Sequence, residues 1–114
     1  MTTMPSTVTE VCIGYLSQIP RGQGRQFDIG GRLIAVFHMR DGGVHATQAG
    51  CPHRGGPLAD GIIGGTTVIC PLHGKRFDLA TGQERTGQTA TAECALVTFP
   101  ARVTEEAEII VRVD

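Results

Sequence analysis

Two short segments each pair a cysteine with a histidine, and these residues could bind a metal. The segments are Cys51-Pro52-His53 and Cys70-Pro71-Leu72-His73, and sixteen residues lie between them. With four cysteines and four histidines in 114 residues, each of the two spacings is expected by chance only roughly 0.14 times. Each pair is also followed by glycine, which lets a loop turn sharply and bring N–H groups close to a buried group. The spacing therefore indicates a four-ligand metal site.

The order of the four ligands bears on which metal they bind. Two cysteines and two histidines fit tetrahedral zinc by composition. The usual zinc finger pairs two cysteines on one turn and two histidines on another, whereas here each segment supplies one of each. This mixed order suits a binuclear iron centre, with both thiolates on one iron and both imidazoles on the other. The residues favour iron–sulfur and leave zinc as the alternative.

Short strands are expected to position both pairs. The apolar residues often alternate with polar ones, and no stretch of 12 residues shows helical periodicity. Turns are expected at Gly30-Gly31, Asp41-Gly42-Gly43 and Thr81-Gly82. Strands are expected near residues 11–13, 25–29, 33–38, 44–48, 66–69, 76–79 and 109–113. We therefore predict an all-β fold, a small antiparallel sandwich or barrel in one domain over residues 1–114, with a metal-binding subdomain at about 49–80.

The composition argues against several classes of partner. Ten basic and eleven acidic residues leave the chain near neutral, with no Trp and one Tyr, so we expect no nucleic-acid partner. No stretch is long and apolar enough for a membrane span. Residues 1–9 lack the basic and apolar regions of an export signal. A soluble cytoplasmic protein is the expectation.

The remaining cysteines and histidines receive ordinary interpretations. Two disulfides are disfavoured by the absence of an export signal and by the histidine beside each of two cysteines. Cys12 and Cys94 lie among apolar neighbours, so we expect buried free thiols without a function. His38 and His45 are expected at ordinary strand positions. The glycine-rich residues 21–24 lack a following Lys-Ser/Thr, so they predict a turn and not a phosphate loop.

The surroundings of both pairs, CPHRGGPLADG and CPLHGKRFDLATG, resemble the Rieske [2Fe–2S] family, and within it the cytoplasmic ferredoxin-type members. The resemblance implies one [2Fe–2S] cluster per chain, with Cys51 and Cys70 on one iron and His53 and His73 on the other. It implies no catalytic residue, because sulfide and protein ligands fill every iron position.

Departures from the respiratory branch of that family are informative. That branch has an additional cysteine in each loop, forming a disulfide, and a Ser and a Tyr that donate hydrogen bonds to the cluster. The corresponding residues here are Gly56, Leu72, Lys75 and Phe77. Without those donors, the reduction potential is expected at the low end of the Rieske range, on the order of −150 mV.

The resemblance implies an electron carrier and leaves its partners open. One reading is a low-potential ferredoxin that passes one electron from a flavin-containing, NAD(P)H-dependent reductase to a terminal oxygenase. A second is the small subunit of an NADH-dependent nitrite reductase, with the large subunit as its partner. A third is a non-redox assembly module that binds zinc or no metal. Arg54, Lys75 and Arg76 could form a positive rim for an acidic partner, or be solvated loop charges.

Overall fold

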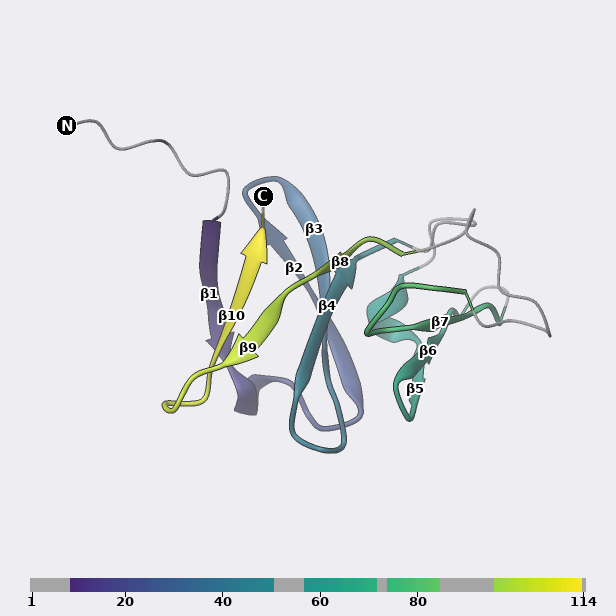
Figure 1. Ribbon diagram of the computed structural model, residues 1–114, viewed down its shortest axis with the longest axis horizontal. Coiled ribbons are helices and arrows are strands. Elements are labelled where there is room, and N and C mark those ends of the chain that lie inside the picture. Colours follow the sequence, from purple (N-terminus) through teal and green to yellow (C-terminus); the bar gives the residue numbers. More distant parts are fainter. Residues whose placement is uncertain (1–8, 51–56, 72–73, 85–95, 114) are drawn as a thin grey trace.

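The fold is built almost entirely from antiparallel strands. The computed structural model describes residues 9–50, 57–71, 74–84 and 96–113, and within them three sheets lie one beside the next (Figure 1). The first sheet, in the order β1-β10-β9, comprises β1 (Thr9–Tyr15), β10 (Glu108–Val113) and β9 (Ala101–Val103). The second, in the order β2-β3-β4-β8, comprises β2 (Gln23–Ile29), β3 (Arg32–His38), β4 (Val44–Gln48) and β8 (Thr98–Phe99). The third, in the order β5-β6-β7, comprises β5 (Ile62–Gly64), β6 (Thr67–Ile69) and β7 (Arg76–Asp78).

Helical structure is confined to short turns in this part of the chain. The two 3₁₀ turns are η1 (Leu16–Gln18) and η2 (Leu58–Asp60). Among the described residues, no helix is long and apolar enough to cross a bilayer. The all-β prediction is confirmed, while the division into one domain over residues 1–114 with a subdomain at about 49–80 stays a prediction.

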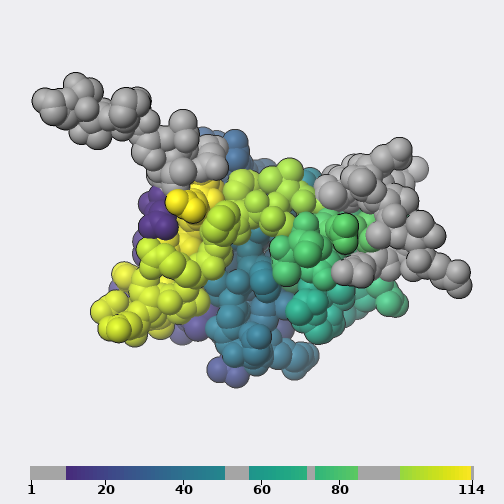
Figure 2. Space-filling view, in the orientation of Figure 1, coloured from purple at the N-terminus to yellow at the C-terminus, as the bar shows by residue number. Residues whose placement is uncertain are grey.

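Strand β3 is the middle layer and is buried on both faces. Its residues 34–38 and the following Met39 lie in an unbroken buried run, because alternate side chains enter two different cores. One face joins the sandwich core, which lies against the first sheet and contains Ile19, Ile34, Val36, Val44, Ala46, Ile109 and Val111. The other face joins the insert-side core, which lies against the third sheet and contains Ala35, Phe37, Met39, Leu58, Ile63, Val68, Cys70, Phe77, Leu79 and Leu96. In the space-filling view the green surface of residues 62–84 adjoins the blue surface of β4 (Figure 2).

The expected turns lie where the sequence places them. Gly30 and Gly31 have φ angles of +61° and +88° between β2 and β3, a conformation that favours glycine, and Gly31 N donates to Asp28 Oδ1 at 2.8 Å. Between β3 and β4, Gly43 N donates to Asp41 Oδ1 at 2.8 Å. These hairpins set the register that brings the end of β4 to the first Cys–His segment.

The expectation for Cys12 is wrong, because its side chain is exposed. Cys12 lies opposite Ile110 in the β1–β10 pair, one position along from the pair Val11 and Val111. Val111 is fully buried in the sandwich core, and successive side chains of a strand alternate between faces. Cys12 therefore points to the outer face of the first sheet. Cys94 lies outside the described residues.

Candidate metal centre

Cys70 is the one predicted ligand that lies within the described residues. Cys51, His53 and His73 lie outside them. Accordingly, no group of three or more His, Cys, Asp or Glu side chains that could hold a metal is found in residues 9–50, 57–71, 74–84 and 96–113. The structure therefore describes two parts of the site: Cys70 itself, and the residues that flank the two Cys–His segments.

Cys70 follows β6 directly and is 1% exposed. Cys70 N donates to Lys75 O at 2.7 Å, and Gly74 N donates to Cys70 O at 3.0 Å. Gly74 has a φ of +71°, which a residue with a side chain rarely adopts. These contacts hold Cys70 close to Gly74 and Lys75, while packing in the insert-side core buries the Cys70 side chain.

The first Cys–His segment is tied at both ends as well. Gly50 and Pro57 form an antiparallel bridge, and Leu58 N donates to Ala49 O at 3.0 Å. The Gln48 side chain adds a second tie, because its Nε2 donates to Gly50 O at 2.7 Å while its Oε1 accepts from Val97 N at 2.8 Å. Gly50 and Pro57, the residues on either side of 51–56, are therefore held next to each other.

The anchors of both segments rest on the same core. Leu58, just after the first segment, is fully buried in the insert-side core together with Cys70 and Phe77. A soft thiol that is shielded from water, next to the fixed ends of a second Cys–His segment, fits a thiolate-bound iron–sulfur group. The described residues are thus compatible with a cluster held between the two segments.

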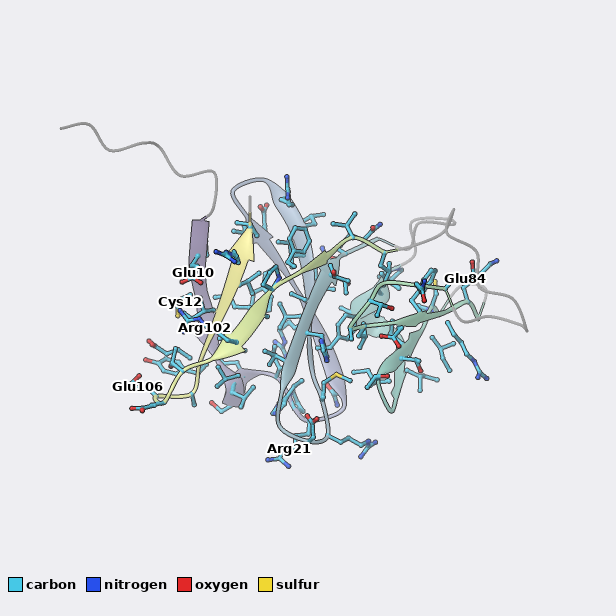
Figure 3. The ribbon with its side chains drawn as sticks, in the orientation of Figure 1. Glu10, Cys12, Arg21, Glu84, Arg102 and Glu106 are labelled. Carbon is cyan, nitrogen blue, oxygen red and sulfur yellow. The ribbon has the colours of Figure 1, made fainter. Side chains whose placement is uncertain are left out.

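Lys75 forms an ion pair that the sequence did not predict. Its Nζ lies 3.0 Å from Glu84 Oε2, and the two side chains are 27% and 5% exposed. Glu84, which is labelled in Figure 3, forms an antiparallel bridge with Phe77 of β7. The positive-rim hypothesis treated Lys75 as a charge offered to a partner, whereas this charge is directed to a buried carboxylate. Arg76 is exposed, and Arg54 lies outside the described residues.

His38 and His45 occupy strand positions, as predicted. His38 is 6% exposed, and its Nδ1 lies 2.6 Å from Ile19 O, a carbonyl that only accepts, so Nδ1 carries the proton. Its Nε2 is buried and has no hydrogen-bond partner among the described residues. His45 is half-buried on β4. Neither histidine belongs to a metal-binding group within the described ranges.

Phe77 stands where the respiratory branch of the resembled family has a tyrosine. Its ring is fully buried and packs in the insert-side core that contains Cys70. A phenylalanine offers no hydroxyl donor there. The other two informative departures, Gly56 and Leu72, lie outside the described residues.

Several known proteins are similar to this chain in sequence or in fold. The ferredoxin component of the naphthalene 1,2-dioxygenase/salicylate 5-hydroxylase systems of Ralstonia sp. is 35% identical over 68 residues, 60% of this chain and 64% of that protein. The ferredoxin of carbazole 1,9a-dioxygenase from Nocardioides aromaticivorans superposes with a TM-score of 0.75 at 28% identity, covering 90% of this chain and 96% of that one. A structure from Mycobacterium tuberculosis, described as an NADH-dependent nitrite reductase small subunit, has a TM-score of 0.85 at 24% identity, covering 96% and 98%.

Other curated relatives are much longer proteins, of which the match covers 13% to 16%. The profile of the Rieske [2Fe–2S] domain family matches residues 9–100, most of the chain. The resemblance read from the two Cys–His segments is therefore confirmed, together with the cofactor that it implies. This chain belongs to the Rieske [2Fe–2S] domain family and is of the ferredoxin type, with a [2Fe–2S] cluster as its cofactor.

Proposed function

We propose that this chain is a low-potential Rieske ferredoxin that passes single electrons between two protein partners. The proposed donor is a flavin-containing, NAD(P)H-dependent reductase, and the proposed acceptor is a terminal oxygenase, both in the cytoplasm. Cys51 and Cys70 would bind one iron, and His53 and His73 the other.

The observation that carries the proposal is the common base of the two Cys–His segments. The Gly50–Pro57 bridge closes the first segment, and the Cys70–Lys75 hydrogen bond closes the second. Leu58 and Cys70 then lie in one buried core. Ligands that come from two fixed places in the fold suit a [2Fe–2S] cluster, which needs donors from both Cys–His segments.

The ligand set determines the chemistry of the proposed site. When bound, a [2Fe–2S] cluster with two thiolates and two neutral imidazoles accepts one electron more readily than a cluster with four thiolates. Four protein ligands leave no open iron position for a substrate, so the proposed role is electron transfer and not catalysis. Cys70, Leu58 and Phe77 would exclude water on the buried side.

The low potential follows from what surrounds the buried ligand. Hydrogen bonds to cluster or ligand sulfur stabilise the reduced state and raise the potential. Phe77 has no hydroxyl group that could donate such a bond. Lys75, at another position where the respiratory branch differs, pairs with Glu84. We therefore expect a potential near the low end of the Rieske range, on the order of −150 mV.

The purified protein tests this proposal directly. Visible absorption, together with iron and acid-labile sulfide analysis, should give a coloured protein with two irons and two sulfides per chain. A colourless protein that contains zinc and no iron would instead support the assembly-module alternative. Protein-film voltammetry should then show a one-electron couple, and a potential above about +100 mV would contradict the low-potential assignment.

A second candidate function is the small subunit of an NADH-dependent nitrite reductase. It is favoured by the CPHRGGPLADG stretch and by the carboxy-terminal FPARV, which resemble those subunits at least as well as ferredoxins. The chain would then be a fixed enzyme component. Purification of the tagged chain from its own cell distinguishes the two functions. Stoichiometric recovery with a large sirohaem protein supports the subunit, and recovery without one supports the ferredoxin.

A further inference from the structure

We propose that Glu84 and Lys75 are positioning residues of the cluster, whose ion pair holds closed the base of the second Cys–His segment. This inference rests on the proposed ligand role of Cys70 and His73. The pair itself would touch neither iron nor sulfide. It would act through the backbone of Lys75, which bonds to Cys70.

The backbone of Lys75 is connected directly to that of Cys70. Lys75 O accepts from Cys70 N at 2.7 Å, and Gly74 N donates to Cys70 O at 3.0 Å. The backbone of Lys75 therefore fixes the end of β6 that presents the Cys70 thiol. Any movement of Lys75 would also change the span available to segment 71–74, in which His73 lies.

The side chain of Lys75 is connected to Glu84 by an ion pair. The Nζ–Oε2 distance is 3.0 Å, and the Glu84 side chain is only 5% exposed. A buried carboxylate is strongly disfavoured without a cation or hydrogen-bond donors, so the ion pair with Lys75 stabilises the charged form of Glu84 in its buried position. The side chain of Lys75 is 27% exposed, so water could solvate the lysine charge if the ion pair were broken. Glu84, at 5% exposure, would not be solvated in the same way.

Glu84 is held in place by the hydrogen-bonded turn that precedes it. Asp78 N donates to Gln83 O at 2.8 Å, and Gly82 N donates to Asp78 O at 2.7 Å. The Asp78 carboxylate also accepts from Ala80 N at 2.8 Å and Thr81 N at 3.1 Å. The turn after β7 is thus held by several bonds, and it returns Glu84 to a bridge with Phe77. Glu84 therefore has a defined position, and its ion pair with Lys75 positions the lysine side chain.

Four single variants of the purified, cluster-containing protein test the inference. Lys75→Met removes the cation, Glu84→Gln removes the anion at nearly constant shape, and Lys75→Arg keeps the charge. Glu10→Gln is the matched control, because Glu10 Oε1 also lies 3.0 Å from a cation, Arg102, but that pair is exposed on the first sheet. The readouts are the rate of cluster loss to a chelator, followed by visible absorption, and the electron paramagnetic resonance (EPR) spectrum of the reduced protein.

The expected result separates positioning from general stability. Lys75→Met and Glu84→Gln should lose the cluster about tenfold faster, equivalent to about 1.4 kcal/mol, and should shift or broaden the EPR spectrum. Lys75→Arg should restore both properties, and Glu10→Gln should match wild type. If Glu84→Gln does not fold, the comparison of Lys75→Met with Lys75→Arg decides, because Lys75 is partly solvent-exposed.

Unchanged loss rates and unchanged EPR spectra in Lys75→Met and Glu84→Gln would overturn this inference alone. Faster loss with an unaltered EPR spectrum would also overturn it, since a merely structural pair would act in that way. A wild-type protein that binds no cluster would overturn the proposed function, and this inference with it.

Discussion

Gln48 is predicted to secure the first Cys–His segment, and Gln48→Leu is the variant that tests it. The substitution nearly keeps the side-chain volume but removes the bonds to Gly50 O at 2.7 Å and from Val97 N at 2.8 Å. The backbone bond from Gln48 N to Val97 O at 2.9 Å is retained. A typical hydrogen bond contributes about 0.5–1.5 kcal/mol net. Because Val97 is exposed and Gly50 is half-buried, water can replace part of the loss, so we expect about 1–2 kcal/mol in total.

A loss of stability of this size should produce two measurable effects in the cluster-containing protein. For a domain of about this size, the midpoint of thermal unfolding should fall by roughly 5–10 °C in far-ultraviolet circular dichroism. If the bonds close the segment, cluster loss to a chelator should become about 5- to 30-fold faster. The matched control is Gln26→Leu, because Gln26 is exposed on β2. A Gln48→Leu protein with the unfolding midpoint and loss rate of the Gln26→Leu protein would refute the reasoning.

Three further predictions concern the insert-side core and the ligands. Leu58→Ala should destabilise the protein by about 2–5 kcal/mol in denaturant unfolding, because the side chain is fully buried, and a loss below about 1 kcal/mol would show that Leu58 is no anchor. Phe77→Tyr should raise the potential in voltammetry if its hydroxyl donates to sulfur, by about 40 mV for each 1 kcal/mol of preference for the reduced state. An unchanged or lower potential would count against the hydrogen-bond explanation. His73→Cys should retain iron in part and lower the potential, because a thiolate adds negative charge, and an unchanged potential would undermine the ligand assignment.

The sequence predicted the strands well where one rule determines the outcome. The double glycine at 30–31 can adopt positive φ angles, so the β2–β3 hairpin could be predicted locally. The alternation at Ile109 and Val111 likewise predicted an inward face, and both side chains are buried. For Cys12 the apolar neighbours were misleading. A period of two places alternate residues on opposite faces, and the neighbours of a residue therefore do not share its environment.

The contacts around the site depended on tertiary structure. Lys75 and Glu84 lie nine positions apart in the sequence, and no helical or strand spacing joins them. Their contact arises because the turn after β7 reverses the chain at Gly82, whose φ is +82°. The Nε2 of His38, which has no hydrogen-bond partner within the described residues, is likewise buried by tertiary packing and not by local sequence. The motif predicted the family, while the ligand set as a whole stays a prediction.

In the proposed metal centre, two cysteines and two histidines of this chain bind one [2Fe–2S] cluster. Pulsed EPR of the chemically reduced protein measures this most directly, because nitrogen nuclei bound to iron couple to the unpaired electron. We predict one spin per two irons, couplings from two imidazole nitrogens, and loss of one coupling in His53→Cys and in His73→Cys. A reduced cluster without nitrogen couplings, or couplings that persist unchanged in both variants, would contradict the account.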